Sequence, residues 1–389
     1  MPNDASELHA FDFHPRTRIV YGPDSVDRLG ALARELGAAR AMVVSDPGIV
    51  KAGHTQRGLD ALQQAGLATA LFQDVVENPT TKTVASGVQF AQDFRPDLIV
   101  GLGGGSAMDA AKGVNFLFTN GGKMQDYWGR DKAQKPMLPM IAVPTTAGTG
   151  SEAQSYALIS DAETHVKMAC GDKKAACKIA VLDPTLTVTQ PPRVTALTGV
   201  DALTHALETW VTNVRNPISL AFSREAWRLL HVHLHRVLET ASDLEARGAM
   251  QVGACWAGSA IENSMLGAAH ATANPLTARY KVVHGQAVAV MMPHVIRFNA
   301  VECEPLYREL TSSTASEFVP ASGGSAALAE FIQKLSQKAG LATNLKSLGV
   351  EEAALPQLAA DAMKQWTAGF NPRKVTEEKL LEIYRAAYN

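Results

Sequence analysis

Four side chains in the second half of the chain are of types that bind divalent metals: Asp201, His205, His270 and His284. Asp201 and His205 are four positions apart, so on a helix they lie on the same face. Two imidazoles from later segments would complete a site of one carboxylate and three imidazoles. Such a ligand set suits Fe(II) or Zn(II) and suits Mg(II) or Ca(II) poorly.

Each of these residues also has an ordinary structural explanation. An acid and an imidazole at this spacing often only stabilise a helix face. His270 stands among alanines and could be a core residue, and His284 could cap a helix start. The joint occurrence of the four favours the metal site. Thr198 is expected to cap the helix that carries Asp201.

A glycine-rich segment in the first half, residues 100–109, follows an apolar run and precedes a helical pattern. Glycines let a backbone approach a pyrophosphate closely, and the helix start offers free N–H groups. We expect Ser106 to be the N-cap and Asp109 to complete a variant capping box. Ser106 replaces the third glycine of G-x-G-x-x-G, and the P-loop ending is absent. A metal together with a nucleotide indicates redox chemistry on a metal-held oxygen.

Asp46 ends an apolar run and could hold the ribose of a nucleotide. A carboxylate there would bond the ribose hydroxyls and repel a 2′-phosphate, which favours NAD over NADP. The alternative is that Asp46 only begins an Asp-Pro-Gly turn, and the sequence does not decide between the two. A second small-residue loop, residues 143–152, carries hydroxyls that could line a cofactor site.

The first half alternates apolar runs with helical patterns, which predicts a parallel α/β sheet covered on both faces. Strands are expected at residues 41–46, 69–72, 97–102 and 140–144, and helices at 59–65, 84–93 and 107–118. From about Thr195 the helical period dominates, and helices are expected at 202–211, 218–240, 244–266 and 326–339. A proline-punctuated connection places the boundary near Pro191. We therefore expect domains at residues 1–190 and 191–389.

Bulk composition excludes several classes of protein. A chain of 389 residues is too long for one hydrophobic core. The net charge of −2 gives no footprint for nucleic acid or an anionic membrane, and no apolar run is long enough to span a bilayer. The polar N-terminus is unlike a signal peptide, and four cysteines are too few for a disulfide framework. We expect a cytoplasmic protein without a nucleic-acid or membrane partner.

Taken in order, several motifs resemble the iron-containing (group III) alcohol dehydrogenase family. They are Asn78-Pro79-Thr80, Gly103-Gly104-Gly105-Ser106 with Asp109 and Lys112, Pro144-Thr145-Thr146 through Glu152, Asp183-Pro184, Gly199 through Ala206, and His270 through Gly285. The resemblance implies an N-terminal Rossmann-like NAD-binding domain and an all-α C-terminal domain that binds the metal and carries the catalytic site. It further implies hydride transfer between a primary alcohol, or its aldehyde, and NAD, in a homodimer or larger homo-oligomer. The four metal ligands carry over to Asp201, His205, His270 and His284, with Fe(II) expected and Zn(II) possible.

The resemblance also implies which residues contact NAD. We add Asp109, which belongs to the same glycine motif, to this set. The cofactor-binding residues are Asp46, Asn78, Gly104, Gly105, Ser106, Asp109, Thr145, Thr146, Thr149 and Lys167.

One catalytic position departs from the family pattern. Many members have a second histidine four residues after the third ligand, and Asn274 stands there. Asparagine cannot act as a general acid or base at neutral pH, although it can hydrogen-bond substrate or cofactor. The proton is then expected to leave through a ribose hydroxyl, water or a threonine.

Two other functions remain open at this stage. A dehydroquinate synthase-like lyase would share the architecture and use NAD only transiently, but it needs clustered basic residues near the metal. The segments around the histidines offer mainly Arg279 and Lys281, which argues against the lyase. The other alternative is a non-catalytic nucleotide-binding protein, against which the complete ligand set argues.

Overall fold

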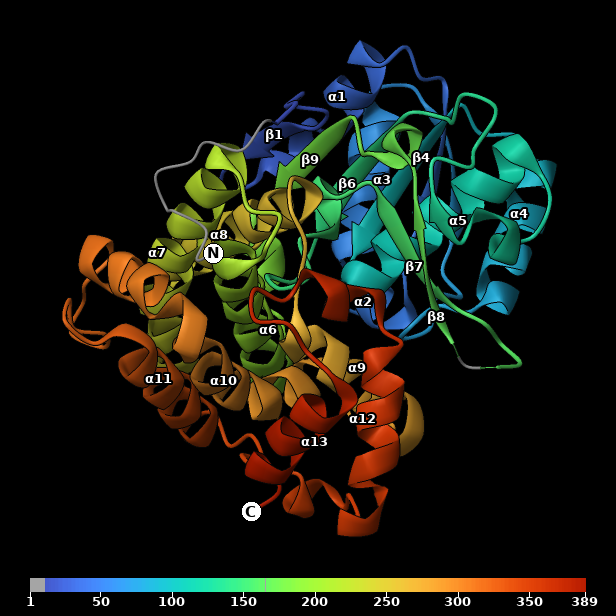
Figure 1. Cartoon of the computed structure of the whole chain (residues 1–389). Coiled ribbons are helices and arrows are strands. Elements are labelled where there is room, and N and C mark those ends of the chain that lie inside the picture. Colours follow the sequence, from blue (N-terminus) through green and yellow to red (C-terminus); the bar gives the residue numbers. More distant parts are fainter. Residues whose placement is uncertain (1–10, 165) are drawn as a thin grey trace. The chain divides into compact units, whose positions relative to one another are not determined.

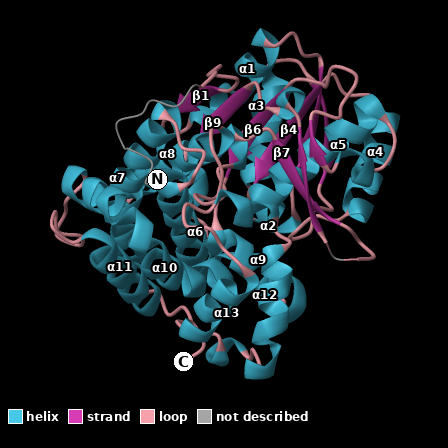
Figure 2. Cartoon of the chain, viewed as in Figure 1, coloured by secondary structure: helices cyan, strands magenta, loops and turns pink. Residues whose placement is uncertain are grey.

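The computed structural model describes residues 11–164 and 166–389. Contacts within the chain divide it into two compact units. One spans His14–Gln190, and the other comprises Pro191–Asn389 with residues 11–13. All strands of the described residues lie in the first unit, and the second is built from helices (Figure 2). Among the described residues, no helix is long and apolar enough to cross a membrane.

A six-stranded parallel sheet forms the centre of the first unit. Its strand order is β1-β9-β6-β4-β2-β3, and each neighbouring pair runs parallel. The strands are β1 (Arg18–Tyr21), β2 (Arg40–Val44), β3 (Ala68–Phe72), β4 (Leu98–Gly103), β6 (Met140–Pro144) and β9 (Ile179–Leu182). The central strands are fully buried, which explains why they read as continuous apolar runs. The predicted parallel α/β architecture is confirmed.

Successive side chains of a strand point to opposite faces of the sheet. Both faces carry apolar side chains here, and helices cover both of them. Met42 and Val44 pack in the core that contains residues of α4 (Thr81–Phe94) and α5 (Gly105–Asn120). Ala41 and Val43 pack in the core that contains residues of α1 and α3. The helices on this second side are α1 (Leu29–Glu35), α2 (Pro47–Lys51) and α3 (His54–Gln64) (Figure 1).

A second, three-stranded sheet was not predicted. It consists of β5 (Gly129–Arg130), β8 (Lys167–Gly171) and β7 (Tyr156–Ser160), in that order. The β7–β8 pair is antiparallel and β5 pairs with β8 in parallel. Ile159 and Met168 anchor it in the core that includes α5. These strands are short and only partly apolar, so their sequence signal is weak.

The order of strands reverses between β2 and β4. The chain runs outward from β2 to its neighbour β3, whereas β4 is followed on its other side by β6. In open parallel sheets, ligands bind outside the carboxyl ends of the strands at such a reversal. Asp46 follows β2 and Gly104 follows β4, so the topology places two predicted nucleotide-binding residues at this point.

The glycine loop enters α5 differently from the sequence expectation. Gly104 is the N-cap and no side chain caps the helix, so the predictions that Ser106 is the N-cap and that Asp109 completes a capping box are wrong. Ser106 lies in the first turn, where its Oγ accepts from Asn78 N at 3.2 Å. Asp109 instead accepts from Ser151 Oγ at 2.8 Å. Because the N-cap residue is a glycine, no side chain accepts from the first N–H groups of α5, and these groups stay accessible to a ligand.

The second unit is all-helical in its described residues, as predicted. Its helices are α6 (Pro192–Val211), α7 (Pro217–Glu239), α8 (Leu244–Glu262), α9 (Ala268–Tyr280), α10 (His284–Ser313), α11 (Gly324–Lys338), α12 (Leu355–Met363) and α13 (Glu377–Ala386). Nearly every residue of α6 from Thr195 to Val211 is buried, and α6 contacts α7, α8 and α10. A helix buried on all sides is the core of its domain.

The start of α6 lies further upstream than expected. Pro192 begins the helix, consistent with the preference for proline in the first turn. The prediction that Thr198 is the cap is wrong, because Thr198 lies within the helix and its Oγ1 donates to Val194 O at 2.9 Å. The turn that carries Asp201 and His205 therefore lies well inside α6 rather than at its start.

Candidate functional site

Asp201 and His205 project from adjacent turns of the buried helix α6. Nε2 of His205 lies 3.5 Å from Oδ1 of Asp201, and both side chains are more than nine-tenths buried. The predicted i,i+4 pair therefore shares one face of the helix.

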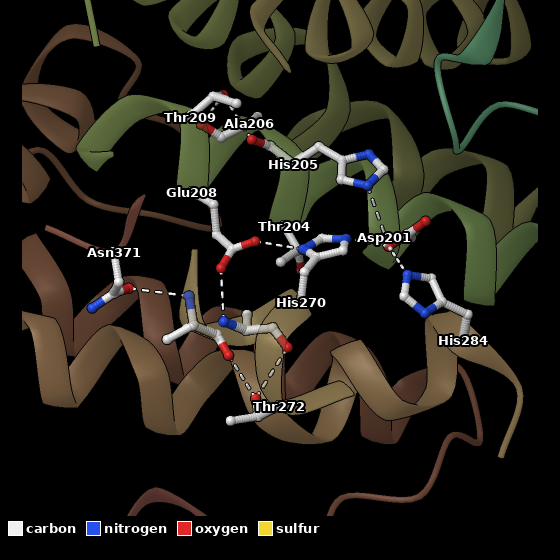
Figure 3. Close-up of polar contacts among 12 residues, drawn as sticks. Asp201, Thr204, His205, Ala206, Glu208, Thr209, His270, Thr272, His284 and Asn371 are labelled. Atoms are coloured by element: carbon white, nitrogen blue, oxygen red, sulfur yellow. Dashed lines mark hydrogen bonds and ion pairs between the residues drawn. The ribbon is translucent and has the colours of Figure 1, made fainter. Parts of the chain in front are cut away.

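His270 reaches the same carboxylate from another helix. It is in the first turn of α9, and its Nε2 lies 3.4 Å from Oδ1 of Asp201. The rings of His205 and His270 stack with centroids 4.8 Å apart. Figure 3 shows both imidazoles turned toward Asp201.

His284 is the first residue of α10 and completes the cluster. Its Nε2 lies 3.8 Å from Oδ1 of Asp201 (Figure 3). Its side chain is 23% exposed, so the cluster is least covered at His284. A Cβ on Gly285 would lie 2.4 Å from Leu197 O. Glycine is therefore needed for α10 to begin this close to α6, which is what brings His284 to Asp201.

The arrangement fits a transition metal. Candidate ligand atoms of Asp201, His270 and His284 lie within 4.8 Å of one another, and Nε2 of His205 faces the same carboxylate oxygen. Among the described residues, Asp201 Oδ1 and His270 Nε2 are buried without a hydrogen-bond partner. Buried polar atoms are normally bonded, and an ion between these two atoms would give both of them a partner. One carboxylate and imidazoles are ligands for Fe(II) or Zn(II).

Electrostatics within the cluster are strongly coupled. Burial by itself would raise the pKa of Asp201, but the imidazoles of His205, His270 and His284 outweigh burial and hold that pKa below its usual range. Burial would lower the pKa of His270, but the carboxylates of Glu208 and Asp201 raise it to about 9. Binding of a cation to Nε2 and protonation of His270 therefore compete.

Sequence reasoning missed Glu208. Its Oε2 accepts from Nδ1 of His270 at 2.5 Å, and its Oε1 accepts from Ala269 N at 2.7 Å (Figure 3). A signal was present, because Asp201, His205 and Glu208 are spaced i, i+4 and i+7 and so share one helix face.

Asn274 lies one turn beyond His270 on α9 and is half-buried. Its Nδ2 donates to Oε1 of Gln365 at 3.0 Å. Gln365 precedes a 3₁₀ helix, Trp366–Phe370, whose Trp366 side chain is exposed. The residue that departs from the family pattern is thus held by an amide–amide hydrogen bond.

Several of the predicted nucleotide-binding residues, Asp46, Gly104 and Thr145 among them, follow the carboxyl ends of strands of the large sheet. Asp46 caps α2, with Oδ1 accepting from Gly48 N at 2.9 Å. Its other oxygen, Oδ2, lies 3.4 Å from the position of a Cβ on Gly103. Asp46 therefore has a structural role as the cap of α2, its contact with a ribose stays a prediction, and Oδ2 still faces the glycine loop.

The loop after β6 packs against the glycine loop after β4. Thr145 N donates to Gly103 O at 3.0 Å. A Cβ on Gly105 would meet Thr149 at 2.6 Å, and a Cβ on Gly104 would meet Thr146 at 3.5 Å. Thr145 Oγ1 is buried and, among the described residues, has no hydrogen-bond partner. A glycine cradle with an orphaned hydroxyl beside an uncapped helix start fits a phosphate-bearing cofactor.

Asp109 lies within α5, and Lys167 begins β8 of the small sheet. Asp109 is buried, and burial raises its pKa, against which the charges of Lys112 and Lys167 act. Lys112 is also buried and donates to Ser151 O at 2.6 Å and to Tyr156 O at 3.0 Å. Asp109 therefore holds the second loop through Ser151. The NAD contacts predicted for Asp109, Lys167 and the other cofactor-binding residues stay predictions.

The two units together define a class of protein: a parallel α/β unit with a glycine loop at its strand reversal, in one chain with a helical unit that carries a carboxylate–imidazole cluster. Residues 15–184 match the iron-containing alcohol dehydrogenases, and residues 195–388 match the C-terminal region of the Fe-containing alcohol dehydrogenase family. The chain belongs to the iron-containing alcohol dehydrogenase family, a family of oxidoreductases.

Curated relatives match over almost the whole chain. The 1,3-propanediol dehydrogenase of Klebsiella pneumoniae is 33% identical over 382 residues, which cover 97% of this chain and 99% of that protein. The NAD-dependent methanol dehydrogenase of Bacillus methanolicus is 32% identical over 371 residues, covering 95% and 97%. A solved 1,3-propanediol oxidoreductase structure has a TM-score of 0.93 at 32% identity and covers 98% of this chain and 100% of its own.

Proposed function

We propose that the chain is a metal- and NAD-dependent alcohol dehydrogenase that transfers a hydride between a primary alcohol, or its aldehyde, and NAD. The observation that carries the proposal is the convergence of three imidazoles on Oδ1 of Asp201, at 3.4 to 3.8 Å. Residues 1–190 would form the NAD-binding domain, and residues 191–389 the metal-binding and catalytic domain. A relative that depends on NAD by name supports the choice of cofactor.

Asp201, His205, His270 and His284 would hold Fe(II), with Zn(II) as the alternative that the same donors suit. When bound, the metal polarises the substrate oxygen as a Lewis acid and NAD exchanges the hydride. Asp201 would supply a buried negative charge to the metal. The substrate would approach at His284, the most exposed residue of the cluster.

At the sheet edge, the chain's own groups would bind and orient the dinucleotide. The uncapped start of α5 after Gly104 offers N–H groups and a positive dipole end to the pyrophosphate. Oδ2 of Asp46 would accept from the ribose hydroxyls, and its charge would disfavour a 2′-phosphate. Thr145 Oγ1 would gain the partner that it otherwise lacks.

Asn274 would orient substrate or cofactor by hydrogen bonding, without taking a proton. Only one of its donor hydrogens is used in the bond to Gln365, which leaves the carbonyl and the other hydrogen for a ligand. The proton released on alcohol oxidation would then leave by a hydroxyl or by water.

A small primary alcohol or its aldehyde is the substrate class that the relatives favour, since two of them act on 1,3-propanediol and methanol by name. The same relatives favour a dehydrogenase over a dehydroquinate synthase-like lyase or a non-catalytic protein. Assays of a panel of primary alcohols with NAD, after loading with Fe(II) or Zn(II), test the proposal. Absence of NADH formation with every alcohol, from protein that holds both metal and NAD, would overturn it.

The quaternary structure proposed from the family is a homodimer or a larger homo-oligomer. Size-exclusion chromatography with light scattering tests it, since a monomeric mass at micromolar concentration would contradict it.

A further inference from the structure

Glu208 makes two hydrogen bonds to the first turn of α9, one to a backbone N–H and one to a side chain. Its carboxylate is buried, with one oxygen on the ring of His270 and the other on the backbone N–H of Ala269. A buried carboxylate is costly unless it is paired and hydrogen-bonded. The structure places Glu208 where both of its oxygens have partners.

We infer that Glu208 is a positioning residue for the metal: it fixes the tautomer and orientation of His270 so that Nε2 is the atom that binds the ion. The inference deepens the proposed function and rests on a metal at this cluster. Glu208 itself is not proposed as a ligand, because its Oε2 accepts a hydrogen bond from Nδ1 of His270 at 2.5 Å.

The tautomer follows from the donor inventory. An ionised carboxylate only accepts hydrogen bonds, so the ring nitrogen that faces it must carry the hydrogen. In a neutral imidazole the other nitrogen then holds the lone pair. That nitrogen is Nε2, which lies 3.4 Å from Oδ1 of Asp201. A carboxylate behind a metal-binding imidazole also makes the imidazole a stronger ligand.

The backbone contact anchors the carboxylate of Glu208 that accepts from the ring. Gly267 is the N-cap of α9 and has no side chain to cap the helix. Glu208 Oε1 accepts from Ala269 N, and Asn371 Oδ1 accepts from Ala268 N at 3.2 Å (Figure 3). A Cβ on Gly267 would lie 2.9 Å from Asn371 Oδ1 and 3.2 Å from Glu208 Oε1, so glycine there lets both side chains approach.

These two caps supply a matched pair of variants. Glu208 and Asn371 both cap the start of α9, but only Glu208 touches the imidazole. Glu208→Gln keeps the shape and removes the charge. If the amide NH₂ faces Nδ1, it forces the hydrogen onto Nε2, and if it faces Ala269 N, two donors oppose each other. Asn371→Ala removes a cap from the same helix end, together with the bonds of Asn371 to Asn299 and to Arg373 O, and leaves the bond from His270 to Glu208 in place.

The test measures the Zn(II) dissociation constant of the full chain by competition with a chromophoric chelator. Glu208→Gln should weaken Zn(II) binding by about 10- to 100-fold. Asn371→Ala should lower the melting temperature of the metal-free protein but change Zn(II) binding by less than about threefold. Unchanged binding in Glu208→Gln, or an equal loss in both variants, would overturn the inference, because Glu208 would then be only a cap.

Failure of the proposed function is separable from failure of this inference. If the unmodified chain binds neither Zn(II) nor Fe(II), the proposed metal site is wrong, and so is the role of Glu208 in positioning a ligand. If Glu208→Gln does not fold, ¹⁵N-resolved spectra of the zinc-loaded natural chain decide. A hydrogen on Nδ1 of His270 supports the inference, and a hydrogen on Nε2 overturns it.

Discussion

Nε2 of His270 lies 3.4 Å from Oδ1 of Asp201, although the two residues come from different helices and, within the described residues, neither atom has a hydrogen-bond partner. Removing either side of this pair should remove the metal. We expect His270→Ala to lose more than about 100-fold in metal affinity, since even the partners of ligands typically contribute 10- to 100-fold. Turnover should fall with the bound metal.

Metal analysis by mass spectrometry and NADH formation in the same samples check this prediction. His270→Ala also leaves the carboxylate of Glu208 unpaired, so a parallel His284→Ala variant is needed. Its side chain is 23% exposed, and its loss disturbs packing less. A metal-free His270→Ala protein with full activity would contradict the account.

Asn274→Ala tests the proton route. General acid–base groups typically contribute 10²- to 10⁴-fold, which an amide cannot supply. We therefore expect kcat/KM to fall by less than about tenfold, with the same pH profile as the natural chain. Gln365→Ala is the control, because it removes the hydrogen-bond partner of Asn274 and keeps the amide itself. A loss of a thousandfold in Asn274→Ala would mean that this position takes part in proton transfer.

Asp46→Asn tests selectivity for NAD over NADP. The amide oxygen can still accept from Gly48 N, so the cap of α2 is kept while the negative charge is lost. One charge near a 2′-phosphate is worth about 1–4 kcal/mol, so the ratio of kcat/KM for NADP to that for NAD should rise about tenfold or more. Asp46→Ala should show the same change plus a loss of about 1 kcal/mol in stability. An unchanged ratio in both variants would show that Asp46 only caps the helix.

Gly105→Ala and Gly104→Ala should separate stability from cofactor binding. A Cβ on Gly105 would overlap Thr149 at 2.6 Å, and we expect a loss of about 1–3 kcal/mol in the free energy of unfolding. A Cβ on Gly104 would meet Thr146 at an ordinary 3.5 Å, so that variant should stay stable and bind NADH more weakly. Denaturant titration and NADH fluorescence measure the two effects. Unweakened NADH binding in Gly104→Ala would argue against a pyrophosphate at this loop.

Stability should depend on pH through His294. Burial, aided by the charge of Arg297, lowers the pKa of His294 to about 4. The unfolded chain binds a proton at its ordinary pKa of about 6.5, so between these values the unfolded state is favoured as the pH falls. The free energy of unfolding should drop by roughly 1.4 kcal/mol per pH unit from this group. In His294→Leu the slope between pH 6 and 4.5 should be shallower by about that amount, and an unchanged slope would contradict the prediction.

Much of the architecture was predictable because two periodicities differ sharply along the chain. Buried parallel strands such as Leu98–Gly103 read as apolar runs, and helices such as Pro217–Glu239 show the 3.6-residue period. The small sheet with β7 and β8 was missed because its strands are short and partly polar. Helix starts were missed at Gly104 and Pro192, where backbone geometry rather than a capping side chain begins the helix.

The residues of the candidate site could be predicted from the sequence, but their arrangement around Asp201 could not. The sequence places Asp201 and His205 on one face, yet it does not say that α9 and α10 bring His270 and His284 to the same oxygen. Glu208 shares the face of Asp201 and escaped notice because its role depends on the start of α9, a contact between distant segments.

The measurement that tests the central claim most directly is metal-dependent NADH formation. The chain is stripped of metal, titrated with Fe(II) or Zn(II), and assayed with a primary alcohol and NAD beside His284→Ala. The account predicts that activity rises with the metal until one ion per chain is bound and that His284→Ala stays inactive throughout. Full activity in the stripped protein, unchanged by added metal, would contradict it.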